Sequence, residues 1–137
     1  NRRRTELVSQ KAPENAPLIL ELSAPKRGLL ATAQIIDGEI IVKAGSHITT
    51  NWVGNRKYQI NYQTKHQELL ASDVIRVSEN LSVFKENYAF SSLSTAAAII
   101  LGRSANGRIE WKLKTDGRTY AEWEDSQLAD AAERNLI

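Results

Sequence analysis

The spacing of apolar and polar residues divides the first third of the chain into short extended segments. Residues 18–22, "LILEL", alternate weakly and predict an edge strand. Two β-rich runs, 29–36 and 39–44, flank the pair Asp37-Gly38. This pair favours a tight type I′ turn, because both central residues of that turn need a positive φ. The pattern therefore predicts an antiparallel hairpin.

The middle of the chain changes between turn, helical and extended patterns. Residues 47–55 are rich in turn-forming residues and are expected to form a loop. Aromatic and apolar residues at roughly helical spacing predict a helix over 57–72, with Tyr58, Tyr62, Leu69 and Leu70 on its apolar side. Residues 74–78 predict a short strand.

A second extended segment and a short helix follow. Residues 82–90 favour extended structure, with a hairpin turn expected at Glu86-Asn87. Ser92 is then expected to cap a helix that ends at Gly102, with Thr95 a weak substitute for the glutamate of a capping box. The small residues at 96–98 predict close packing of this helix on a sheet.

The last third predicts one strand and one helix. Residues 108–114, "RIEWKLK", alternate, so Ile109, Trp111 and Leu113 would face the core and the charged residues solvent. Asp116-Gly117 predicts a turn. Thr119 is expected to cap a final helix to about 135, with an apolar stripe of Tyr120, Trp123, Leu128, Ala131, Ala132 and Leu136.

These elements predict an α+β fold, a small and mostly antiparallel sheet of five or six short strands with about three helices packed on it. Residues 1–16 are polar and open with three arginines, so they are expected to be a linker or a disordered basic terminus. Residues 17–137 would form a single domain. Methionine is absent, at position 1 too, which indicates a piece of a longer protein.

Composition excludes several classes of protein. Hydrophobic residues make up 42% and charged residues 25% of the chain, as in ordinary soluble domains. No apolar run approaches the ~20 residues of a membrane span, and no secretory signal is present, so no membrane contact and a cytoplasmic location are expected. Without cysteine, and with only His47 and His66, the sequence predicts neither a metal site nor a cofactor.

Signals of catalysis are weak. The sequence contains no Gly-rich phosphate loop, no GxSxG elbow and no HExxH motif, so no catalytic residue is expected. His66 and Glu68 lie two positions apart and do not share a helix face. His47, beside Gly45-Ser46, is expected to be a solvated polar residue, with a role as a base or a phosphate contact as the alternative.

Charge is unevenly distributed although the net charge is only +2. Residues 103–118 carry five positive and two negative charges, whereas 122–133 carry five acidic residues and no basic one. A basic segment beside an acidic helix can orient a charged ligand. A solvated charged surface explains the same pattern without a partner.

The basic segment supplies the candidate nucleic-acid contacts. Alternate residues of a strand lie ~6.6 Å apart, close to the spacing of phosphates along one strand of nucleic acid. We therefore expect Arg103, Arg108, Lys112 and Lys114 to contact phosphates, with Ser104 and Asn106 near a base or the backbone. Alternatively, Arg103 satisfies carbonyls at a helix end and the lysines only solvate a sheet face.

The run "FSSLSTAAAIILGRSANGRIEWK", followed by "DGRTYAEWE", resembles an uncharacterised bacterial domain family often found C-terminal to GIY-YIG nuclease domains. The resemblance spans about residues 29–124, and the same serine cap, small helix and Asn-Gly segment are similar to the RAMA (restriction enzyme and adenine methylase associated) domain. Leu93 stands where the family usually has proline, and Val74 where it usually has glycine.

The resemblance implies a non-catalytic, DNA-associated module in a bacterial nuclease or in restriction and defence, one that could sense modified bases. Double-stranded DNA is the expected partner. No GIY or YIG tripeptide is present, so a nuclease centre would lie outside this sequence. The alternative is a protein-interaction or dimerisation module that docks a partner domain through the acidic helix at 119–135.

Overall fold

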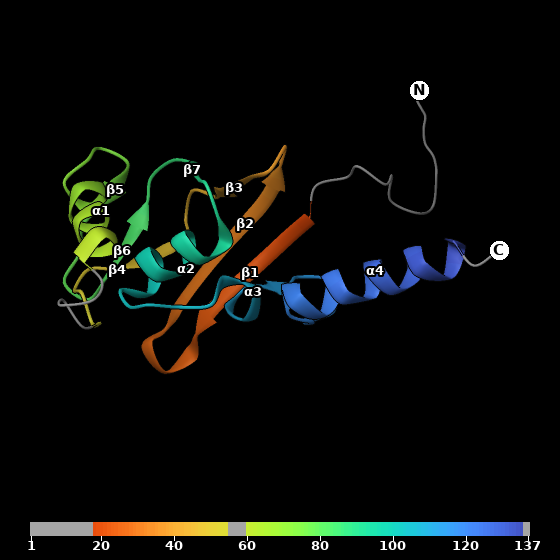
Figure 1. The fold of residues 1–137 in the computed structure, drawn as a ribbon. Helices are drawn as coiled ribbons and strands as arrows, with labels where there is room; N and C mark the ends of the chain where they lie inside the picture. Colours follow the sequence, from red (N-terminus) through yellow and green to blue (C-terminus); the bar gives the residue numbers. More distant parts are fainter. Residues whose placement is uncertain (1–17, 55–59, 136–137) are drawn as a thin grey trace, which may run out of the picture.

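The computed structural model describes residues 18–54 and 60–135, and its fold is α+β, as predicted (Figure 1). The described residues form more strands than the five or six expected. In chain order the elements are β1 (Leu18–Ala24), the 3-10 helix η1 (Pro25–Arg27), β2 (Leu29–Ile36), β3 (Glu39–Val42), β4 (His47–Thr49), α1 (Ile60–Leu70), β5 (Ile75–Arg76), β6 (Leu81–Phe84), β7 (Tyr88–Phe90), α2 (Leu93–Leu101), α3 (Gly107–Glu110), β8 (Lys112–Leu113) and α4 (Tyr120–Asn135).

The larger sheet has the order β7-β3-β2-β1-β8, and every pairing in it is antiparallel. The predicted hairpin is confirmed, since β2 pairs with β3 and the turn residues Asp37 and Gly38 have φ values of 51° and 82°. The expected edge strand is not at the edge. β1 pairs along its whole length with β2, and on its other side Leu20 and Glu21 pair with β8.

The smaller sheet has the order β4-β6-β5 and corrects two expectations. The expected loop at 47–55 begins with β4, because His47–Thr49 pairs with β6. The expected hairpin at Glu86-Asn87 is wrong, since β6 belongs to this sheet whereas β7 pairs with β3 in the larger one. The linking segment is instead tied to β3's end, where the Asn87 side-chain oxygen accepts a hydrogen bond from the Ala44 N–H at 2.8 Å.

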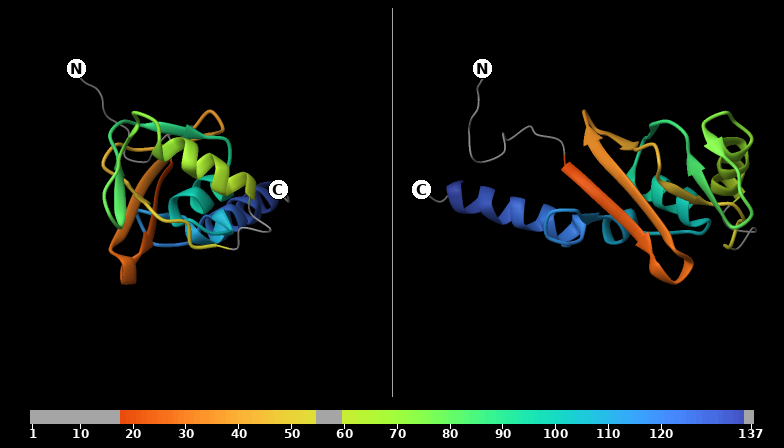
Figure 2. Two further views of the ribbon diagram at one scale, coloured as in Figure 1. Left: turned by 90° about the vertical axis from the view of Figure 1, so that its left-hand side faces the viewer. Right: turned by 180° about the vertical axis from the view of Figure 1, so that it is seen from behind.

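Helix α2 forms the centre of the core against the larger sheet (Figure 1). Its alanines at 96–98 are fully buried, which confirms the expected close packing. Its ends are also as predicted: the Ser92 side chain accepts from the Thr95 N–H, and Gly102 has a left-handed φ of 77°. Among the residues that the structure describes, no helix covers the opposite face of the larger sheet (Figure 2, right).

Helix α1 begins within the range predicted for it, and residues 57–59, with Tyr58, lie outside the described part. Leu69 is buried as expected, but two polar residues, Gln63 and His66, are buried beside it. The predicted strand at 74–78 is shorter than expected, because only Ile75 and Arg76 pair with β6.

The predicted strand at 108–114 is wrong. Residues Gly107–Glu110 form the single-turn helix α3, and only Lys112–Leu113 pair with β1. Trp111 and Leu113 are buried as predicted, but Ile109 is half exposed. The physical reason is a cap: the Asn106 side chain accepts the Arg108 N–H at 3.0 Å, which starts a helical turn where alternation suggested a strand.

Helix α4 begins as predicted, at a capping box formed by Thr119 and Glu122. Its first turns pack on the body through Tyr120 and Trp123. The predicted apolar stripe does not continue, because Leu128 is 66% exposed and the helix projects away from the sheets (Figure 1). Across the described residues, no helix combines the length and apolar character that crossing a bilayer requires.

Candidate functional site

The candidate binding segment, residues 102–114, leaves α2 at Gly102 and returns to the first turn of the same helix at Gly107. Both glycines are closely packed. The Gly102 carbonyl accepts hydrogen bonds from the N–H groups of Val53 and Gly54, each at 2.8 Å, and the Gly107 N–H donates to the Ser94 hydroxyl at 2.9 Å. The Asn-Gly pair is therefore a helix cap followed by a close-packing residue, not a hairpin turn.

The two arginines of the candidate site point into solvent but have carboxylate partners. The Arg103 guanidinium lies 3.5 Å from a Glu110 carboxylate oxygen and donates to the Ser104 carbonyl at 3.1 Å. Arg108 forms an ion pair and hydrogen bond with Glu124 of α4. Exposed ion pairs of this kind contribute only about 0–1 kcal/mol, so a phosphate could replace either carboxylate.

The two lysines lie at the sheet edge formed by β8. Lys112 stands opposite Glu21 in register, and the Lys114 N–H donates to the Ile19 carbonyl at 3.0 Å, so both backbone positions are fixed by β1. Both side chains are exposed. Within residues 18–54 and 60–135 neither lysine forms an ion pair, although Glu21 lies on the same sheet face as Lys112.

The remaining candidate residues have structural roles. Asn106 uses its side-chain oxygen to cap α3. Ser104 is exposed, and its carbonyl accepts from Arg103. The structure thus brings Arg103, Ser104, Asn106 and Arg108 together beside α2. It places Lys112 on strand β8 and Lys114 in the turn directly after that strand.

Sequence reasoning missed a third arginine close to this segment. Arg27, in η1, donates from its guanidinium to the Leu101 carbonyl at the end of α2, at 3.0 Å. Burial, and secondarily the nearby positive charge of Arg103, lower the pKa of Arg27. A cation at a helix C-terminus is a common arrangement, but these residues are 74 positions apart, so local sequence could not have paired them.

Both histidines form hydrogen bonds with backbone groups. The His47 Nδ1 accepts the backbone N–H of Leu30 at 2.9 Å. His66 is buried and donates from Nε2 to the Thr49 carbonyl at 2.7 Å, while the edge of its ring meets Trp52. Burial lowers the pKa of His66, and the hydrogen bond to Thr49 opposes this in part. In the described ranges no group of three metal-ligating side chains comes together.

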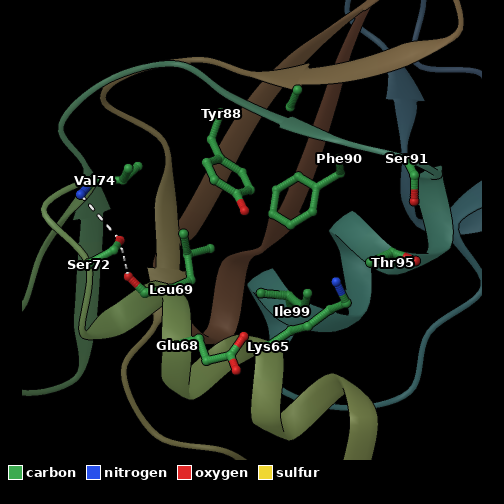
Figure 3. A pocket seen from close by; sticks show the side chains of 11 residues that line it. Lys65, Glu68, Leu69, Ser72, Val74, Tyr88, Phe90, Ser91, Thr95 and Ile99 are labelled. Carbon is green, nitrogen blue, oxygen red and sulfur yellow. Dashed lines mark hydrogen bonds between the residues drawn. The ribbon is translucent and has the colours of Figure 1, made fainter.

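A pocket of about 360 Å³ lies between α1, β7 and the start of α2, a feature that sequence reasoning did not predict (Figure 3). Tyr88 and Phe90 from β7 form an aromatic wall, and Lys65 and Glu68 of α1 form a charged rim. The pocket combines residues from three elements, so no local motif marks it. The only local signal is the spacing of Tyr88 and Phe90, which places both rings on one face of a strand.

The match to a protein family covers most of these features. A family model described as "Domain of unknown function (DUF4357)" matches residues 20–124. The chain belongs to this family. The matched part of the DUF4357 domain includes both sheets, the candidate cationic segment and the pocket, and it ends inside α4. No curated protein and no solved structure matches the chain.

Proposed function

We propose that this DUF4357 domain is a non-catalytic nucleic-acid-binding accessory domain, with double-stranded DNA as its partner, in a bacterial nuclease or restriction and defence protein. The observation that supports this best is a set of four cations on one continuous segment, of which Arg103 is half-buried and Arg108, Lys112 and Lys114 are exposed. The setting in defence rests on the resemblance to GIY-YIG-associated and RAMA domains.

The exposed residues Lys112 and Lys114 support this proposal most strongly. Lys112 and Lys114 lack ion-pair partners in the part of the chain that the structure describes, so binding a phosphate would not require them to give up a carboxylate. Lys112 lies in β8 and Lys114 in the turn that follows it, two positions apart in the chain, so they offer neighbouring contacts to a phosphate backbone. Arg108 and Arg103 would also contact phosphates, once a phosphate replaces the carboxylate partner of each, Glu124 and Glu110 respectively.

The test is binding of a DNA duplex to the 137-residue chain across a range of salt concentrations. The double variant Lys112→Gln, Lys114→Gln removes two exposed charges. We expect its affinity to fall by on the order of ten-fold and its log–log salt slope to decrease by roughly 2. The matched control Arg76→Gln, Lys85→Gln removes two exposed charges elsewhere and should keep the slope.

Two results would contradict this proposal. One is the absence of salt-dependent binding to plain and methylated duplexes alike. The other is an equal loss of affinity in the control variant, which would show that only net charge matters and that the β8 edge is no binding surface.

A second candidate function is docking of a partner domain or of a second copy through α4. It is favoured by the exposure of Leu128, at 66%, on a helix that projects from the body (Figure 1). Truncation after Gln127 tests it, because the packed residues Tyr120 and Trp123 are retained. Light scattering should show that association is lost while the near-ultraviolet spectrum of the fold is kept. Unchanged association would exclude this surface.

A further inference from the structure

The pocket between α1, β7 and α2 has one aromatic wall and an apolar floor. The rings of Tyr88 and Phe90 lie 4.9 Å apart at 67°, which is an edge-to-face arrangement. Leu69, Val74 and Ile99 line the floor (Figure 3). Phe90 is almost fully buried by the core, whereas Tyr88 is only half buried, so the Tyr88 ring is available to a ligand. Such a surface favours a planar ring over a flexible chain.

The rim adds one positive and one negative side chain to that wall. Lys65 and Glu68 are three positions apart on α1 and both line the pocket, yet they form no ion pair with each other. In Figure 3 the Lys65 ammonium and the Glu68 carboxylate both extend from α1 along the cavity. One rim thus offers a hydrogen-bond donor beside a hydrogen-bond acceptor.

Some hydroxyl groups at the pocket already have hydrogen-bond partners within the described part of the chain, and others do not. The Ser72 hydroxyl already donates to the Leu69 carbonyl and accepts the Val74 N–H, so it holds the turn after α1. The Thr95 hydroxyl is bonded to Ser92. The Tyr88 hydroxyl has no hydrogen bond within the described part of the chain, and it points into the cavity (Figure 3).

This lining excludes several classes of ligand. A phosphate or other anion would meet the Glu68 carboxylate, and an aliphatic ligand would remove Lys65 and Glu68 from water without pairing them. A volume of about 360 Å³ is at the small end of ligand pockets and fits one small molecule. A small ring with a hydrogen-bond acceptor and a donor on one edge can pair with Lys65 and with Glu68, and it also fits the volume of the pocket.

We propose that this pocket binds a single nucleobase, which stacks on Tyr88 while its hydrogen-bonding edge meets Lys65 and Glu68. Every nucleobase carries such an edge and a π face. This inference rests on the proposed function, because nucleic acid is what would deliver the base, either extruded from a duplex or as a free nucleoside. Extrusion costs least at mismatched or damaged positions.

Methyl-detected NMR of the 137-residue chain tests the pocket without phosphate chemistry. Free adenosine, guanosine, cytidine and thymidine are added in turn. We expect saturable shifts at the methyl groups of Leu69, Val74 and Ile99, but not at Leu22 and Val42 in the sheet core. Glu68→Gln, which loses a charged acceptor, should weaken binding about ten-fold. The control Glu86→Gln removes a nearby exposed carboxylate and should bind as the parent does.

The arms of this experiment separate the pocket from the DNA-binding proposal. Nucleoside binding without duplex binding supports the pocket as a site for free nucleosides and counts only against the DNA surface. Tighter binding to a duplex with one mismatch, lost in Tyr88→Leu, supports an extruded base. Duplex binding with no nucleoside response, or a response to free tryptophan and not to nucleosides, overturns the assignment.

Discussion

The backbone of Gly107 lies directly against Leu93 in the first turn of α2. A β-carbon at Gly107 would come within 2.2 Å of the Leu93 carbonyl carbon and 2.3 Å of the Ser94 nitrogen. The contact is fixed by two hydrogen bonds, from the Gly107 N–H to the Ser94 hydroxyl and from the Trp111 indole N–H to the Leu93 carbonyl. The Asn-Gly pair of the candidate segment is therefore part of the packing of α3 on α2.

Gly107→Ala tests this contact. The added methyl group meets main-chain atoms, which cannot turn away as a side chain can, so α3 must shift from α2. We expect a loss of about 3 kcal/mol in the free energy of unfolding, measured by urea denaturation. As a control, Gly117→Asn places a side chain in open space at a φ of 79°, which asparagine tolerates, and should cost less than about 1 kcal/mol. Equal losses in both variants would contradict the packing role.

Local signals in the sequence predicted local structure correctly. The Asp37-Gly38 turn, the Ser92 cap, the Gly102 stop and the Thr119 cap each depend on residues within four positions, and each is present. The prediction of a strand at 108–114 is wrong because a contact with a residue distant in the sequence helps to decide its structure. Its alternation fits a strand, but the contact of Gly107 with Leu93 and the Asn106 cap decide for a helical turn.

The candidate site could be predicted only in part. Charge alone marked Arg108 as free to bind phosphate, but the fold brings Glu124 to it from α4. The pocket could not be predicted either, because Lys65 and Tyr88 come from separate elements and line one cavity only when α1 packs beside β7. Pairings across the chain depend on tertiary packing, which residue patterns do not specify.

The hydrogen bond donated by the Trp111 indole N–H is the second link between α3 and α2. A variant without this N–H measures how much the bond contributes to the free energy of unfolding. Trp111 is fully buried, and its Nε1 donates to the Leu93 carbonyl at 3.1 Å. Trp111→Phe leaves that carbonyl without its donor and opens a small cavity. We expect a loss of about 2–3 kcal/mol, seen as a lower urea midpoint. Trp123→Phe, at a half-buried position on α4, should cost less, and the reverse order would count against the role given to Trp111.

The ion pair between Arg108 and Glu124 restrains an arginine that DNA would need. Glu124→Gln removes the partner charge and should raise affinity for a duplex about two- to five-fold at low salt, since Arg108 no longer has to exchange a carboxylate for a phosphate. Asp125→Asn removes the same charge from the neighbouring, exposed position. Fluorescence anisotropy with both variants separates release of Arg108 from a change in net charge. An equal gain in both would mean that Arg108 does not contact DNA.

Buried His66 should make the fold sensitive to mild acid. Because burial lowers its pKa below the ordinary value of 6.5, the unfolded chain binds a proton that the folded chain resists. The stability that this provides is complete above about pH 6.5 and is lost as the pH falls through the lowered pKa. We expect the free energy of unfolding, measured by urea denaturation, to drop between pH 7.5 and pH 5.5 by up to about 1.4 kcal/mol per pH unit, and the urea midpoint to drop with it.

His66→Gln provides the control for that pH dependence. Its amide can still donate to the Thr49 carbonyl but does not titrate, so its midpoint should stay flat over the same range. Asp116 does not interfere. Its pKa is lowered from 3.8, chiefly by the backbone N–H of Arg118, so its effect falls at more acidic pH. If the parent and His66→Gln lose stability in parallel between pH 7.5 and pH 5.5, another group is responsible and the pKa of His66 does not differ between the folded and the unfolded chain.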